Sequence, residues 1–423
     1  MLILVIYITV FVFAYAAYKI IARFSSSNVD YNARKTVTFG DESSVKSNRA
    51  ASVISILTIF LLWGAFTGSK WTPVHVPGPF IGDTSFSYTA TDAQNTSAEA
   101  MVLIRVGLIG QDFQKPEISE AGQSGFAKDD ALKVGAWRSG LIRVQNNDDG
   151  GKEAGYRVTA INGMPVSPEQ SIIVENGTVF MTKKGSLSFA PDKGWQMEPI
   201  WLPSPEAVVA RLIEISTEGY QNVTLMENLG WSLYRVIMGF ALGSLVGIPL
   251  GYAMGLNGWF RGWFDPIVEF MRPVPPLALI PLVIIWFGIW EQGKISLLFL
   301  AALWIMTISA RSGVSGVNIT KVHAAYSLGA SKFQILTRVI VPNSLPEIFT
   351  GARVAMGVCW GTVVAAELVA AEKGAGKMII AASKFQQTDI VIMGIILIGV
   401  IGFSIDILMR FAEKTLVPWK GKS

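Results

Sequence analysis

Long apolar runs alternate with polar segments along this chain. Seven runs contain about 20 mostly apolar residues each, which is the length that a helix needs to cross a bilayer. They are Met1–Ile21, Ala51–Gly68, Leu229–Gly255, Pro266–Trp290, Ile295–Arg311, Ile348–Ala371 and Ile390–Phe411. The pattern predicts an all-α polytopic membrane protein with about seven transmembrane helices.

A long polar segment, residues 69–199, separates the second run from the third. A segment of this length can fold as a small domain of its own. Two Asn-Gly dipeptides, at Asn162-Gly163 and Asn176-Gly177, lie next to short alternating runs and favour hairpin turns between strands. The Ser- and Thr-rich stretch Thr84–Ala98 predicts a flexible lead-in. We therefore predict a β-rich inserted domain with a flexible beginning.

Basic residues between the first two runs predict the topology. Residues 22–50 contain Arg23, Arg34, Lys35 and Lys46, and short basic loops stay in the cytoplasm. The N-terminus and the 69–199 insertion are then outside, and the C-terminus is cytoplasmic. The first run could instead be a signal peptide, because Ala14-Tyr15-Ala16 resembles a cleavage site. No basic residue precedes that run, so we expect an uncleaved helix.

Composition agrees with a membrane protein and excludes several other classes. Of the 423 residues, 51% are hydrophobic and 16% are charged, against roughly a quarter charged in soluble chains. The net charge of +4 is too small to indicate nucleic-acid binding. With Cys359 as the single cysteine and two distant histidines, we expect no disulfide within the chain and no protein-built metal site.

The fourth and sixth runs contain the candidate pathway residues. Pro275 and Pro276 interrupt the fourth run, and broken backbone in a membrane is tolerated inside protein or beside a cavity. Arg272 lies near the end of that run, whereas Trp360 and Glu367 lie in the sixth. An acid within a span is a functional hypothesis by default. Two structural alternatives remain open: a kinked buried helix, and a salt bridge for Glu367.

The most specific motif lies in the polar, basic loop of residues 321–347. It reads His323-Ala324-Ala325, then Gly329-Ala330, then Val339-Ile340-Val341-Pro342. This spacing resembles E-A-A-x3-G-x9-I-x-L-P, the cytoplasmic loop of ATP-binding-cassette importer permeases. The chain departs from that form where His323 replaces Glu and where Val replaces Ile and Leu. The resemblance implies that this coupling loop docks on an ATPase subunit.

Three further segments widen the resemblance. Pro266–Ile289, Ser327–Gly351 and Val364–Gly374 are similar to permeases for taurine, alkanesulfonates and nitrate. The strings A-A-E-L-V-A-A and V-P-W-K-G are most similar to permeases for taurine. The similarity covers residues 51–68 and 201–423, whereas the first helix and the insertion are additions.

The resemblance implies a domain order. Residues 1–21 are an extra transmembrane helix, 22–50 a cytoplasmic linker, 51–68 the first family helix, 69–199 the extracytoplasmic β-rich insertion, and 200–423 the permease core.

The resemblance also implies the type I importer permease fold and a multi-pass subunit in the bacterial inner membrane. Two copies would form one pathway, two ATPase subunits would bind ATP and Mg, and an external binding protein would deliver the solute. The chain itself would be no enzyme and would hold no cofactor.

Taurine is the solute that the resemblance favours. Alkanesulfonate, nitrate or a pyrimidine precursor are the alternatives. A secondary transporter would need inverted repeats, and a membrane-anchored sensor would need a cytoplasmic output domain. The sequence shows neither feature.

Overall fold

A computed structural model describes residues 2–25, 49–92, 96–118, 125–149 and 155–419. The predicted 22–50 linker and the basic C-terminal tail lie mostly outside these residues. The chain forms two compact units, Met1–Glu206 and Ala207–Ser423. Each is described by itself below.

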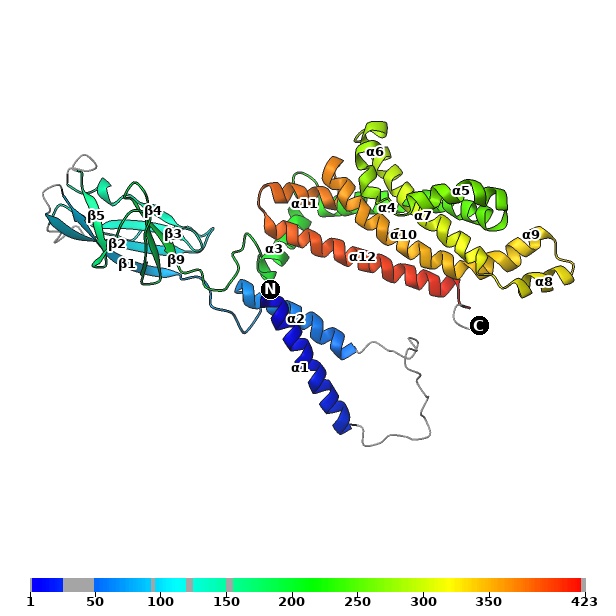
Figure 1. The fold of residues 1–423 in the computed structure, drawn as a ribbon, viewed down its shortest axis with the longest axis horizontal. Helices are drawn as coiled ribbons and strands as arrows, with labels where there is room; N and C mark the ends of the chain where they lie inside the picture. The colour runs from blue at the N-terminus through cyan, green and yellow to red at the C-terminus, as the bar shows by residue number, and fades with distance from the viewer. Residues whose placement is uncertain (1, 26–48, 93–95, 119–124, 150–154, 420–423) are drawn as a thin grey trace. The chain divides into compact units, whose positions relative to one another are not determined.

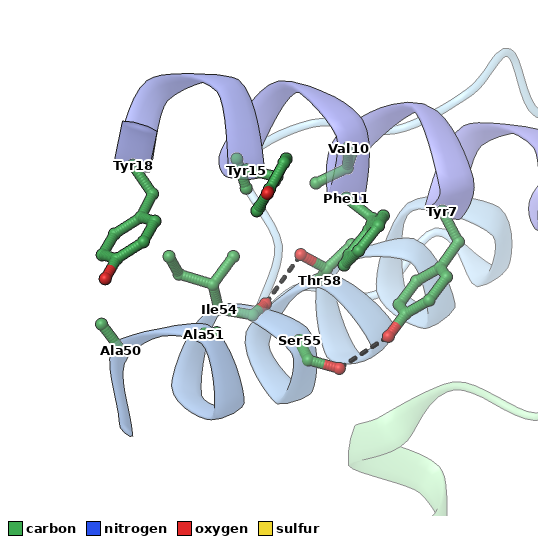
Figure 2. A pocket seen from close by; sticks show the side chains of 11 residues that line it. Tyr7, Val10, Phe11, Tyr15, Tyr18, Ala50, Ala51, Ile54, Ser55 and Thr58 are labelled. Carbon is green, nitrogen blue, oxygen red and sulfur yellow. Dashed lines mark hydrogen bonds between the residues drawn. The ribbon is translucent and has the colours of Figure 1, made fainter. Parts of the chain in front are cut away.

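Two apolar helices begin the first unit. They are α1 (Leu2–Ser25) and α2 (Arg49–Thr67), and both are long and apolar enough to cross a membrane. Figure 2 shows the side chains between them, where the Tyr7 hydroxyl lies 2.6 Å from Ser55 Oγ. A crevice of about 270 Å³ with mostly apolar walls remains between these helices. The two helices therefore touch at a few points without forming a closed core.

Two sheets form the rest of the first unit, and Figure 1 labels β1 to β5 and β9. The larger sheet has the order β3-β2-β1-β5-β6, and the smaller has the order β4-β9-β8-β7. The strands are β1 (Gly82–Thr91), β2 (Ser97–Gly107), β3 (Asp130–Gly135), β4 (Gly140–Ile142), β5 (Arg157–Ile161), β6 (Met164–Pro165), β7 (Ser171–Val174), β8 (Gly177–Met181) and β9 (Leu187–Pro191). Buried side chains from both sheets share one hydrophobic core. We call this structure the β domain.

The expected flexible lead-in is wrong, because Thr84–Thr91 belongs to β1, the central strand of the larger sheet. Phe86, Tyr88 and Ala90 alternate with Ser and Thr, and these three side chains are buried in the core. Both hairpins form. Asn162-Gly163 has positive φ at both residues and joins β5 to β6, as a type I′ turn requires. The other turn lies one residue earlier than expected, because Val174 pairs with Gly177.

The segments that enter and leave the β domain run together. The Met197 N–H donates to the Phe66 carbonyl at 2.8 Å, and the Trp195 N–H donates to the Pro77 carbonyl at 2.7 Å. Ser69 Oγ donates to Glu206 Oε2 at 2.6 Å. Adjacent entry and exit points are typical of a domain inserted into another chain.

The second unit is a helical bundle with α4 (Leu225–Leu256), α7 (Glu291–Ser315) and α10 (Val341–Ala370) at its centre. Glycines at four-residue spacing along α4 let α7 approach closely. A Cβ added at Gly243, for example, would come within 2.6 Å of the Ala302 Cβ. The close packing of α4 and α7 therefore depends on the missing side chains.

Shorter elements and one more long helix complete this unit. They are α3 (Pro205–Glu218), α5 (Gly258–Met271), a 3₁₀ turn (Pro276–Leu279), α6 (Ile280–Phe287), α8 (Ile319–Ser327), α9 (Lys332–Ile335), a π-helical turn (Leu336–Ile340), α11 (Ala375–Lys384) and α12 (Thr388–Leu416). Among the described residues of the whole chain, six helices are long and apolar enough to span a membrane, and the bent pair α5 and α6 makes a seventh candidate. The prediction of a helical membrane protein is confirmed.

Candidate functional site

The chain breaks sharply between α5 and α6. The preceding helix, Gly258–Met271, and the following segment, Pro276–Phe287, meet at 92°. Pro273, Pro275 and Pro276 lie at this break, and proline cannot donate the hydrogen bonds that continue a helix. The predicted fourth span is therefore two segments with irregular backbone between them.

A pocket of about 220 Å³ lies against this break, and we call it the break pocket. Its walls are residues 271–276, Ala301, Trp304, Ile305, Ile308 and Val358. The α7 residues of the wall come from the middle of that 25-residue helix. Arg272, the C-cap of α5, therefore lies beside the middle of α7.

Two side chains give the break pocket its polar groups. The Arg272 guanidinium is 65% exposed, and its Nη1 lies 3.8 Å from Glu269 Oε2. Glu269 also bonds Arg311 at 3.2 Å, so its charge is shared. The indole N–H of Trp304 is buried and finds no acceptor among the described residues. Arg272 is therefore the donor in this wall that a solute in the pocket can reach.

The break pocket is therefore suited to an anion. A guanidinium recognises a planar or tetrahedral oxyanion through several parallel hydrogen bonds. In the described part of the chain, no carboxylate lines this pocket. Its chemistry matches a sulfonate, a carboxylate or another small oxyanion.

The structure places the other two predicted pathway residues elsewhere. Trp360 is 6% exposed, and its indole N–H donates to the Ile398 carbonyl at 3.0 Å, against α12. Glu367 is fully buried near the opposite end of α10 from the coupling loop. Arg272, Pro275 and Pro276 are brought together in the break pocket, whereas Trp360 and Glu367 are not part of its wall.

Glu367 belongs to a buried ionic group that we call the Arg235 cluster, made of Ser232, Arg235, Glu291 and Glu367. Arg235 is 1% exposed, and its Nη1 donates to Glu367 Oε1 at 2.5 Å. Its Nε and Nη2 donate to the two carboxylate oxygens of Glu291 at 2.5 and 2.8 Å. The cluster joins α4, α7 and α10 through one guanidinium.

The same carboxylate holds the beginning of α11. The Gly376 N–H donates to Glu367 Oε2 at 2.9 Å, and Ser232 Oγ donates to Oε1 at 2.8 Å. A side chain at Gly374, where φ is +141°, would run into the Glu367 carboxyl group. Since both oxygens are already engaged, this acid has no free position for a solute. The geometry favours the structural alternative for Glu367.

Two functional candidates were not recognised from the sequence. Trp304 carried a signal, because a tryptophan in the middle of an apolar run brings one N–H into a region without water. Arg235 lies within the third apolar run, Leu229–Gly255. Its partners Glu291 and Glu367 are 56 and 132 residues away, so the sequence offered no means of pairing them.

The coupling loop forms a small helical hairpin. Asn318 caps α8, and Ser331 caps α9 in a reciprocal capping box. Between the two helices Gly329 has φ +80°, which glycine adopts at little cost. Val322, Ala325 and Ala330 pack with Ile335 and Val314, which anchors the hairpin to the end of α7.

The tip of this hairpin carries exposed apolar side chains. Leu328, Phe333 and Tyr326 are 88, 73 and 50% exposed. His323 and Ala324 are exposed on α8, and Pro342 lies in the first turn of α10. Exposed apolar side chains gathered in this way indicate a protein–protein contact.

Comparisons with known proteins agree with the helical bundle and its loop. Residues 231–417 match the family described as binding-protein-dependent transport system inner membrane component. The chain is 45% identical over 227 residues to the taurine transport system permease protein TauC of Escherichia coli, covering 53% of this chain and 82% of that protein.

Two further relatives have different names. The putative aliphatic sulfonates transport permease protein SsuC of E. coli is 37% identical over 230 residues, which cover 54% of this chain and 86% of that protein. The bicarbonate transport system permease protein CmpB of Synechococcus elongatus is 32% identical over 187 residues, which cover 44% of this chain and 67% of that protein. The chain belongs to the family of binding-protein-dependent inner membrane transport components and is an ABC importer permease.

Proposed function

We propose that this permease carries a small sulfonate, with taurine favoured by the resemblance, into the cytoplasm through the break pocket. The observation that carries the proposal is the largely exposed Arg272 guanidinium in a pocket beside the middle of α7 that no carboxylate lines among the described residues. A guanidinium offers several parallel hydrogen-bond donors to a sulfonate group. The 45% identity to a protein named for taurine transport supports taurine among the sulfonates.

Other anions form the second group of candidates. The relatives include one named for aliphatic sulfonates and one named for bicarbonate. Nitrate and a pyrimidine precursor are further candidates that share an anionic group. Because the break pocket recognises one oxyanion, the rest of the solute is selected elsewhere.

The proposed machine has several subunits. Two copies of this chain form the pathway, and two ATPase subunits bind ATP and Mg and dock on the coupling loop. The exposed Leu328, Phe333 and Tyr326 supply the apolar surface for that docking. An external binding protein delivers the solute to the side on which the β domain and the N-terminus lie.

Uptake of radiolabelled taurine into proteoliposomes tests this proposal. The permease is reconstituted with its ATPase and binding protein, with ATP inside the vesicles on the ATPase side. We expect ATP-dependent uptake that excess alkanesulfonate reduces and excess nitrate or bicarbonate does not. ATP-dependent uptake of bicarbonate or nitrate without taurine uptake would overturn the choice of solute.

A further inference from the structure

The β domain contains a second pocket where its two sheets meet. Strand β3 is an edge of the larger sheet and β4 is an edge of the smaller one, and the two strands are neighbours (Figure 1). The pocket has a volume of about 530 Å³, within the range of small-molecule sites. We call it the edge pocket.

Opposite charges line the edge pocket. Asp130, the first residue of β3, contributes a half-buried carboxylate. Lys115 and Arg143 contribute cationic groups, and both side chains are exposed. Neither cation forms a salt bridge with any residue that the structure describes. The apolar part of the wall includes Leu132 and Ile142, so the pocket has one acidic group, two basic groups and an apolar floor.

A second carboxylate lies behind Asp130. The Tyr88 hydroxyl lies 3.5 Å from Asp130 Oδ2 and 3.3 Å from Asp148 Oδ1. Asp148 is 4% exposed, and its Oδ2 has no hydrogen-bond partner within the described ranges. Where both are ionised, these two carboxylates repel each other across the phenol. A cation bound at Asp130 would relieve that repulsion.

We propose that the edge pocket binds a small zwitterion, with its ammonium group at Asp130 and its anionic group at Arg143 and Lys115. A solute with only one charge would leave one side of the pocket unmatched, so selectivity depends on both charges. The choice of taurine as a probe rests on the proposed function, whereas the zwitterion class rests on this pocket alone. The β domain would then bind the solute on the same chain as the permease bundle, which raises the effective concentration of the solute for transport.

The Asp130 carboxylate also predicts how binding depends on pH. Burial, and then the negative charges of Asp148 and Asp129, raise the pKa of Asp130 to about 7, while Tyr88 and Lys115 act in the opposite direction. Protonation removes the charge that holds the ammonium group. Affinity in the edge pocket is therefore expected to fall about tenfold between pH 8 and pH 6.

Equilibrium binding to the purified full chain in lipid nanodiscs, without the ATPase or the binding protein, tests the proposal. The probes are taurine and β-alanine as zwitterions, and ethanesulfonate and ethylamine with one charge each. Asp130→Asn and Arg143→Gln should each weaken zwitterion binding about tenfold or more. The matched controls Asp192→Asn and Arg157→Gln change exposed residues of the same domain outside the pocket and should bind as the unmodified chain does.

The outcomes separate this inference from the proposed function. Two results would overturn the edge pocket alone. One is normal taurine uptake with no zwitterion binding to the chain. The other is zwitterion binding that Asp130→Asn and Arg143→Gln leave unchanged. A different result would support the edge pocket but overturn the proposal that taurine is the transported solute. In that case the chain binds β-alanine or taurine, the two variants weaken this binding, and no taurine uptake is seen. Ethanesulfonate binding that is as tight as taurine binding and is weakened as much by Arg143→Gln would overturn the requirement for two charges.

Discussion

Replacing Glu367 by glutamine tests whether the Arg235 cluster is structural. The substitution keeps the shape of the side chain but turns one accepting oxygen into a donating NH₂ group. Arg235 Nη1, Ser232 Oγ and the Gly376 N–H all point their donors at this carboxylate. One of them would therefore face another donor, and the ion pair with Arg235 would lose one partner.

The magnitude follows from burial. Breaking a buried ion pair from one side costs roughly 3–5 kcal/mol, because the remaining charge stays buried. Arg235 keeps its two bonds to Glu291, so we expect the lower end of that range, about 3 kcal/mol. For a unit of this size that corresponds to a fall in Tm on the order of 5–10 °C. Glu291→Gln, at a 38% exposed side chain, should lower the Tm less.

Thermal unfolding of the purified permease in detergent measures this effect, with taurine uptake in proteoliposomes measured beside it. We expect uptake by Glu367→Gln to fall only as far as the amount of folded protein falls. A Tm within about 1 °C of the unmodified chain, together with a large loss of uptake per folded molecule, would refute the structural role and return Glu367 to the pathway.

Three further predictions concern the coupling loop and the β domain. Gly329→Trp should weaken co-purification with the ATPase and abolish uptake without affecting insertion, whereas Gly329→Asn, which tolerates positive φ, should do so less. If the β domain contacts the external binding protein, deleting residues 72–194 and bridging the gap with a flexible linker should weaken docking of that protein and leave assembly with the ATPase intact. Full docking affinity after the deletion would exclude a docking role for the β domain. The pKa of Asp130 is raised to about 7 in the folded chain, so folding favours the protonated carboxyl. Its contribution to the free energy of unfolding is therefore fully present below about pH 4 and is lost as the pH rises through 7. Asp130→Asn should therefore slow hydrogen exchange of β-domain amides at pH 8 and change it little at pH 4, and faster exchange at pH 8 would contradict this sign.

Hydrophobic patterning predicted the helices well, because span length follows directly from bilayer thickness. It did less well in the β domain. The stretch around Phe86 and Tyr88 looked flexible because Ser and Thr dominate its composition, yet the alternate residues face the core. Period-two burial matters more there than average polarity. The Asn-Gly hairpins were recognisable because few dipeptides adopt positive φ so easily.

The candidate site was only partly accessible from the sequence. The prolines after Arg272 indicated a broken span, and the structure shows a pocket there. The position of Arg272 along α7 is set by packing between two segments that are distant in the sequence, so local sequence could not predict it. Glu367 was recognisable as a buried acid, but its pairing with Arg235 depends on two distant helices meeting. Local sequence shows which apolar runs contain ionisable residues. Packing decides which of these residues are paired within the protein and which can bind a solute.

Uptake by Arg272 variants tests the central claim most directly. Reconstituted complexes of the unmodified chain, Arg272→Lys and Arg272→Gln are compared for ATP-dependent taurine uptake, with the same amount of folded permease and ATPase in each. If Arg272 holds the sulfonate, Arg272→Gln should reduce uptake about tenfold or more, and Arg272→Lys, which keeps the charge without the guanidinium geometry, should be intermediate. Uptake by Arg272→Gln equal to that of the unmodified chain would contradict the assignment of the break pocket to the transport pathway.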